Sequence, residues 1–180
     1  MKKLIMALAV VACATVASAA SFDWKTSTTG KVYTQGTTTV MESGTAYLFD
    51  SATTSQAAMF ALLYDKGDIS SVAALSAKSI EDGKISAGSA FEWGNAGDTL
   101  SAYVVVVDGD NFFISDTASK AGDASATMTL SFALKNASQG AASTATSFGG
   151  AGWYTAVPEP TSGLLMLVGL AGLALRRRRA

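Results

Sequence analysis

Apolar residues recur at every second position in two segments of the chain, residues 85–93 and 128–134. This period matches a strand with one buried face, so both segments are predicted to be half-buried strands. Residues 100–107 are apolar and rich in β-branched side chains through their second half, which predicts a central strand buried on both faces. Asp108-Gly109 then predicts a tight turn into residues 112–114, and thus a hairpin.

A helical period is found in residues 56–64, where Ala57, Phe60 and Tyr64 share one face and residues 53–55 can cap the start. Residues 68–80, followed by Gly83, are predicted to form a second short helix. Two shorter apolar runs, at residues 32–33 and 46–49, indicate earlier strands. Together these patterns predict a mainly β fold: a single antiparallel β-sandwich-like domain over residues 20–156, with one or two short inserted helices.

The first nineteen residues have the order of a secretory signal peptide. Lys2 and Lys3 precede an uncharged apolar run, and Ala17-Ser18-Ala19 supplies small residues at the positions that a signal peptidase reads. We expect cleavage after Ala19, which leaves Ala20 as the first residue. The expected partners of this segment are the Sec translocon and signal peptidase.

Cys13 supports a competing interpretation of the same segment. Val10-Val11-Ala12-Cys13 loosely resembles a lipoprotein box, in which Cys13 would carry a lipid and become the first residue. Cys13 is the single cysteine of the chain. Cleavage after Ala19 therefore leaves a protein without disulfides, whose stability rests on packing alone.

The C-terminal end carries a second apolar segment, followed by four arginines. As a helix, this segment covers about 20 Å, which is short of the ~30 Å hydrocarbon core of a bilayer. Long arginine stems can extend its reach, and the arginines should stay on the cytoplasmic side. We expect a short transmembrane helix made of Gly163, Leu164, Leu165, Met166, Leu167, Val168, Gly169, Leu170, Ala171, Gly172, Leu173, Ala174 and Leu175, with a cytoplasmic anchor of Arg176, Arg177, Arg178 and Arg179.

Residues 157–180 resemble the PEP-CTERM sorting signal, through Pro158-Glu159-Pro160, the apolar run and the arginine cluster. The two prolines hold this strip extended and outside any helix, as a cleaving enzyme requires. The resemblance implies that exosortase, a membrane transpeptidase-like enzyme, cuts near the motif after transient anchoring in the inner membrane. It also implies a Gram-negative host that makes exopolysaccharide. One alternative is that the tail stays uncut as a membrane anchor. The other is that the arginines bind nucleic acid, although a terminal cluster directly after an apolar run argues against this.

Charge and composition exclude several kinds of chemistry in the exported part. Residues 20–157 hold seven lysines and thirteen acidic residues, a net charge near −6, with no arginine, histidine or cysteine. Catalytic triads, Cys-His pairs and the usual zinc sites are thereby excluded. A glycosidase pair of Glu92 with Asp98 or Asp108 is the remaining catalytic candidate, and turn or surface positions explain these acids more simply. We expect no enzyme activity and no cofactor.

Two binding alternatives remain open from the sequence. Asp108-Gly109-Asp110-Asn111 and residues 149–152 each begin like a calcium loop, although both lack a required residue and turns explain them better. Six large aromatic residues could form a sugar-stacking platform, or lie in the core: Trp24, Trp93, Trp153, Tyr33, Tyr47 and Tyr154. The sequence favours a structural or adhesive protein of the cell surface or extracellular matrix, with a secreted carbohydrate-binding module or a lipoprotein as alternatives. Exopolysaccharide is a candidate partner.

Overall fold

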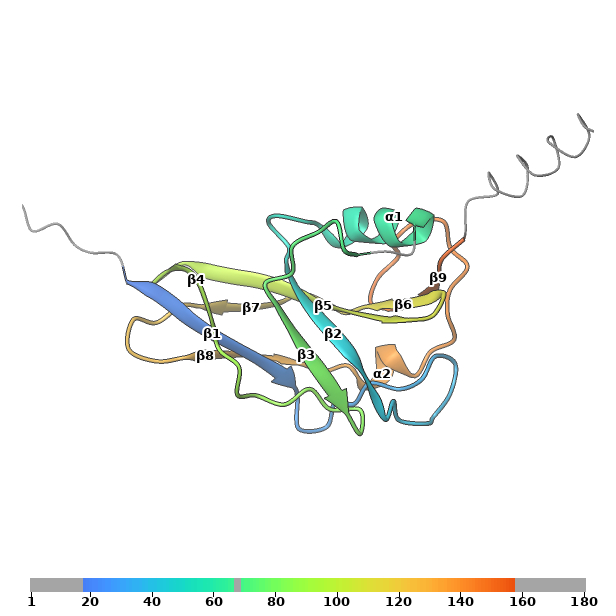
Figure 1. Cartoon of the computed structure of the whole chain (residues 1–180), viewed down its shortest axis with the longest axis horizontal. Helices are drawn as coiled ribbons and strands as arrows, with labels where there is room; N and C mark the ends of the chain where they lie inside the picture. Colours follow the sequence, from blue (N-terminus) through green and yellow to red (C-terminus); the bar gives the residue numbers. More distant parts are fainter. Residues whose placement is uncertain (1–17, 67–68, 158–180) are drawn as a thin grey trace, which may run out of the picture.

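The computed structural model describes residues 18–66 and 69–157, which form two β-sheets and a helix (Figure 1). The small sheet has three strands in the order β4-β1-β8. These strands are β1 (Ala19–Thr26), β4 (Phe91–Asn95) and β8 (Met128–Phe132). β1 runs antiparallel to β4 and parallel to β8.

The large sheet has six strands, five of them in the order β3-β2-β5-β6-β9. They are β3 (Ser76–Glu81), β2 (Ser43–Asp50), β5 (Thr99–Asp108), β6 (Asn111–Ile114) and β9 (Gly152–Thr155). β7 (Ala118–Ala121) pairs with the first part of β5. The helix α1 (Gln56–Lys66) and the single turn α2 (Lys135–Ser138) complete the elements of the described ranges.

Two hydrophobic cores lie on opposite faces of the large sheet. Val104 and Val106 of β5 face the small sheet, where they meet Phe22 and Trp24 of β1. Tyr103 and Val105 of the same strand face α1 and pack in a second cluster with its apolar side chains. The period-two geometry of a strand thus makes β5 the shared wall of a three-layer arrangement, small sheet, large sheet and helix.

Most of the sequence-based strand assignments are confirmed. Residues 100–107 form the buried central strand β5, and Asp108 pairs with Asn111 across the hairpin into β6. Residues 46–49 lie within β2, and residues 128–132 form β8. The helix expected at 56–64 is α1. Strands β1, β7 and β9 and the turn α2 had no prediction.

The second helix expected at residues 68–80 is wrong. Residues 76–81 form β3, while residue 68 lies outside the described residues. Lys78 and Ile80 are buried and their neighbours are not, a period of two that lets β3 pair along β2. Asp82 and Gly83, with φ of 48° and 68°, then turn the chain away from β3.

Three further expectations need correction. The sheets are not wholly antiparallel, because β1 and β8 run parallel. The strand expected at 85–93 is reduced to β4, since Gly88 has a φ of 127° that breaks the extended run. Residues 32–33 do not form a strand, and Tyr33 makes one isolated bridge with Val40.

A buried ion pair joins the two sheets at their edge. Lys78 of β3 points inward and donates a hydrogen bond to Asp23 of β1. Its ammonium also donates to the carbonyl oxygens of Trp24, at 2.7 Å, and Ser86, at 3.1 Å. The backbone N–H of Gly88 donates to the second Asp23 oxygen at 2.7 Å. All three N–H donors of the ammonium therefore have an acceptor, in a site where the Lys78 side chain is only 6 % exposed.

A second polar contact ties the sheets together at the far end of β2. Trp93 of β4 donates its indole N–H to Asp50 at 3.2 Å, and Ala52 N–H donates to the other Asp50 oxygen at 2.8 Å.

Burial, and to a smaller degree the charge of Asp50, raises the pKa of Tyr103 far above its usual range. Tyr103 is therefore a neutral phenol, and it donates to the Thr54 carbonyl at 2.9 Å.

Replacement of Lys78 by methionine is expected to destabilise the protein by about 3–5 kcal/mol, because it leaves the Asp23 carboxylate buried without its partner. Urea denaturation of the purified protein measures this loss. Lys120→Met on the exposed strand β7 is the matched control and should change stability by less than about 0.5 kcal/mol. Equal effects of the two substitutions would contradict a structural role for the ion pair.

Acid should weaken the fold through Asp23. Burial raises the pKa of this carboxyl, but hydrogen bonds from Lys78, Gly88 N–H and Trp24 N–H outweigh burial. The net result is a pKa below its ordinary value. A pKa depressed on folding contributes stability that is complete above the unfolded value, about 4, and is lost as the pH falls through the folded value. Stability measured between pH 7 and pH 2 should therefore fall less steeply below pH 4 in Asp23→Asn than in the unmodified protein. An unchanged slope would show that Asp23 is not the linked group.

Candidate functional site

The last strand of the domain, β9, connects both cores to the C-terminal tail. Trp153 lies in the core between the sheets, 5.7 Å from Phe113 between ring centroids, and its indole N–H donates to the Ser138 carbonyl at 2.7 Å. Tyr154 lies in the core under α1, with ring centroids 4.9 Å from Phe60 and 5.7 Å from Phe112. Successive side chains of one short strand thus anchor it on both faces of the large sheet.

The glycine-rich segment before β9 closes against Tyr154. The tyrosine hydroxyl donates to the Gly150 carbonyl at 2.5 Å and accepts from the Gly149 N–H at 3.2 Å. Gly150 has a φ of 135°, a conformation that favours glycine. Residues 149–152, weighed as a calcium loop, therefore form the tight entry into β9.

The chain remains hydrogen-bonded beyond β9, up to the last described residue. Ala156 N–H donates to the Asp110 carbonyl at 2.7 Å, and Val157 N–H donates to the Tyr64 carbonyl at the end of α1, at 3.0 Å. The Thr155 hydroxyl is 3.0 Å from the Asn111 side-chain oxygen. We call residues 152–157 with these contacts the C-terminal junction. The Val157 side chain itself is 46 % exposed at the surface of the domain.

The N-terminal end of the domain begins at the predicted signal cleavage site. Ser18 accepts a hydrogen bond from Ala96 N–H at 3.1 Å, Ala19 pairs with Asn95, and Ala20 is fully buried. Cleavage after Ala19 would keep Ala20 as the first residue of a β1 shortened by one position. Figure 1 places the start of β1 and the strand β9 at opposite ends of the molecule.

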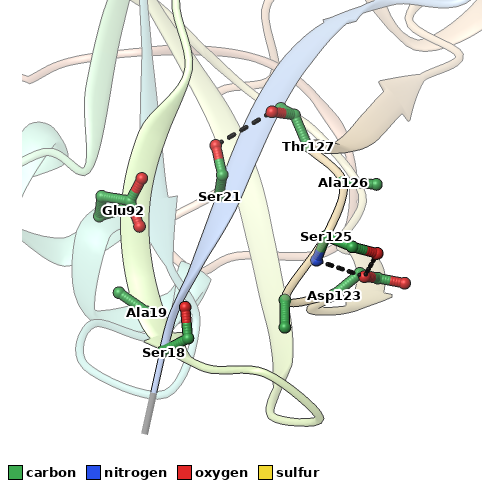
Figure 2. Close-up of a pocket in the computed structure, with 9 residues that line it drawn as sticks. Ser18, Ala19, Ser21, Glu92, Asp123, Ser125, Ala126 and Thr127 are labelled. Carbon is green, nitrogen blue, oxygen red and sulfur yellow. Dashed lines mark hydrogen bonds between the residues drawn. The ribbon is translucent and has the colours of Figure 1, made fainter. Parts of the chain in front are cut away.

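A polar depression lies beside the start of β1 (Figure 2). Glu92 lies on one side of the strand, and Asp123, Ser125 and Thr127 lie on the other. Ser125 donates its N–H and its hydroxyl to Asp123, both at 2.7 Å, and these bonds hold the pKa of that carboxyl below its usual value. Ser18 and Ala19 complete the lining, so the predicted signal cleavage would change this depression.

Of the three candidate catalytic acids, Glu92 lies on β4, and the other two lie at the ends of β5. Asp98 and Asp108 flank this strand at its two ends, about 30 Å apart at the rise of an extended chain. Asp98 accepts a hydrogen bond from Asn95 N–H at 2.8 Å in the turn between β4 and β5. Asp108 lies in the β5–β6 turn, where Gly109 has a φ of 58°. The depression that Glu92 lines includes neither Asp98 nor Asp108, and Asp98 has a turn role.

Residues 108–111, the first calcium-loop candidate, form the hairpin turn between β5 and β6. Within residues 18–66 and 69–157, no three acidic residues gather closely enough to hold a metal ion.

The aromatic residues weighed as a sugar platform belong mainly to the cores. Trp24, Trp153, Tyr33 and Tyr154 are buried, and Trp93 and Tyr47 are partly buried beside them. Trp93 makes an edge contact with Phe22 at 5.9 Å. A planar row of exposed rings, which stacking on sugars requires, is not formed by these six residues.

The comparison with protein families identifies the tail. Residues 156–179 match the model of the PEP-CTERM protein-sorting motif. This chain carries a PEP-CTERM sorting signal. The motif implies an exported protein that is held transiently at the membrane and processed by exosortase. No curated protein and no solved structure matches the chain.

Several predicted processing residues lie outside the described part of the structure. These are Ala17 at the signal site, Pro158-Glu159-Pro160 of the motif, the apolar run 163–175 and the arginines 176–179. In the described residues, 18–66 and 69–157, no helix is long and apolar enough to cross a membrane. No sequence pattern predicts the C-terminal junction, because the four-residue strand β9 is too short to show a recognisable period.

Gly122 provides a test of where β1 begins. A Cβ atom on this residue would lie 2.5 Å from the Cβ of Ala20, so Gly122→Ala should destabilise the protein by about 1–3 kcal/mol. In Gly140→Ala, the matched control, the nearest atom to the new Cβ is the Ala137 carbonyl oxygen, an ordinary contact at 3.7 Å. Thermal unfolding of both variants measures the difference, and equal melting temperatures would place Ala20 elsewhere.

Proposed function

We propose that this chain is a non-enzymatic, PEP-CTERM-sorted protein with a structural or adhesive role at the cell surface or in the extracellular matrix. The observation that carries the proposal is the sorting motif at residues 156–179, which begins at the last residues of a folded β-domain. The domain is the cargo of this signal, and the tail supplies its route.

The domain itself supports a structural role over a catalytic one. Its large aromatic residues fill the two cores, and its candidate acids occupy turns or exposed strand positions. The surface that remains is rich in serine, threonine and alanine, with a net charge near −6 between residues 20 and 157. Such a surface suits contact with neutral or cation-bridged glycans and disfavours binding to polyanions.

The burial of the aromatics removes the main support for a carbohydrate-binding module of the stacking type. The lipoprotein alternative depends on Cys13, which lies outside the described residues. A lipid on Cys13 would add a large, characteristic mass to the purified protein, so a measurement of the intact mass distinguishes this alternative.

The sorting route predicts the fate of two variants expressed in the native host. The unmodified protein should lose residues 176–179, whereas Pro158→Ala with Pro160→Ala, and replacement of all four arginines by glutamine, should each retain the tail. Intact mass measures this directly. Lys120→Gln in exposed β7 is the control and should be processed like the unmodified protein.

Two results would overturn the proposed route. One is retention of the arginines by the unmodified protein in a host that has exosortase. The other is loss of the tail in a host from which exosortase has been deleted.

A matching test addresses the structural role. Deletion of the gene should weaken attachment of cells to one another or to a surface. The unmodified chain should restore attachment, and the variant with both prolines replaced should not. Full restoration by that unprocessed variant would argue against a role for the released protein.

A further inference from the structure

The strand β8 forms one edge of the small sheet, and its outer side is unpaired. Among the described residues, β8 pairs with β1 and with no other strand. The Phe132 carbonyl accepts a hydrogen bond from Ser27 N–H on the β1 side, at 2.8 Å. Because backbone groups alternate in direction along a strand, the N–H and C=O groups of Thr129 and Ser131 face away from β1.

The outer side of β8 is accessible at the end of the strand. A depression of about 210 Å³ lies there, lined by residues 115–118 and 131–134. Ser131 is exposed and Thr129 is half-buried. β7 of the large sheet lies near β8 but pairs with β5. An extended segment of another chain therefore has access to the free backbone groups of this edge.

The edge strands β3, β4, β7 and β9 each carry a feature that opposes pairing with another chain. β3 has the inward-pointing charge of Lys78, and β4 has Glu92 beside Gly94, whose φ is 55°. β7 is four residues long and carries the exposed Lys120. β9 is equally short, and a bridge from Ser143 covers it. Charges, short strands and irregular backbone are the usual means by which edge strands avoid association.

β8 has none of these features. Residues 124–134 contain no charged residue, no proline and no glycine. The strand occupies five of these positions, and its pairing with β1 runs without a bulge. A regular, uncharged edge with free backbone groups is a template for a further strand.

The backbone of β8 is complementary to a second copy of itself in the antiparallel direction. When two such strands are centred on Leu130, Thr129 of one copy lies opposite Ser131 of the other. These are the residues whose N–H and C=O groups face outward, so each such pair exchanges two hydrogen bonds. The hydroxyls of Thr129 and Ser131 then form cross-strand pairs on the solvent face.

The flanking residues favour the same arrangement. On the core face, Met128 of one copy lies opposite Phe132 of the other, and both belong to the apolar core between the sheets. Asp123 precedes the strand and Lys135 follows it. An antiparallel pair brings these unlike charges toward each other across the contact, whereas a parallel pair would bring like charges together.

We propose that two copies of this chain associate through β8, antiparallel about a two-fold axis, so that their three-stranded sheets become one continuous sheet. A five-residue contact is smaller than the standard interface of about 1,600 Å², so the association is reversible and depends on concentration. The pairing goes beyond the proposed function, because it does not depend on exosortase. It would connect copies of a structural protein wherever they are concentrated.

Sedimentation equilibrium of the protein purified from its native host tests this pairing, and a monomer–dimer equilibrium is the expected result. Ser131→Pro removes one outward N–H from each copy, and proline is tolerated at an edge position whose N–H faces solvent. The dissociation constant of the dimer should rise at least about tenfold in this variant. Ser131→Thr keeps both the N–H and the hydroxyl, so it is the matched control and should dimerise like the unmodified protein.

Amide hydrogen exchange gives a second measurement that needs no variant, and it decides the matter if Ser131→Pro does not fold. The amides of Thr129 and Ser131 should exchange at least about tenfold more slowly at concentrations where the dimer forms than at high dilution. The Leu130 amide faces β1 and should exchange slowly at both concentrations.

Three results would overturn the pairing. The first is an unmodified protein that remains monomeric at about 100 μM, the range of weak interfaces. The second is a dimer that persists unchanged in folded Ser131→Pro, and the third is fast exchange of the Thr129 and Ser131 amides at every concentration. Binding of a different protein at this edge, lost in Ser131→Pro, would overturn the second copy as the partner. Retention of the tail arginines contradicts only the sorting route, so the two failures are distinguishable.

Discussion

The buried ion pair between Asp23 and Lys78 is the polar contact that most constrains how the two sheets pack together. It links β1 of the small sheet to β3 of the large sheet, beside the hydrophobic core that the two sheets share. A buried pair of charges is tolerated only when its hydrogen bonds are complete, and here backbone groups of residues 24, 86 and 88 complete them. β3 is placed by its pairing with β2, and the ion pair fixes how the irregular segment after it lies against β1.

The same requirement explains why Gly88 interrupts the alternating pattern of residues 85–93. Its N–H is needed by the Asp23 carboxylate, and its φ of 127° turns the chain to deliver it. Local alternation favoured a continuous strand, whereas the buried Asp23 carboxylate needed a backbone donor. Tertiary hydrogen bonding outweighed the local preference.

The domain ends in two strands, β1 and β9, that lead to the two predicted processing signals. β1 begins at the predicted signal cleavage site, and β9 ends at Thr155, with Ala156 and Val157 between it and Pro158 of the sorting signal. Because these strands leave the domain at opposite ends, the part of the domain near the tail is distinct from the part that was exported first (Figure 1).

The sequence by itself determined the sorting signal, the acidic cysteine-free domain, the central hairpin of β5 and β6, and α1, because motifs, composition and long hydrophobic periods are local properties. It missed the parallel pairing of β1 with β8, misassigned β3 as a helix, and did not find β9. It also left open whether the tryptophans formed a surface or a core. Only the tertiary structure decided these points, because a four-residue strand or a buried lysine acquires its role from partners distant in sequence, and no local pattern encodes those partners.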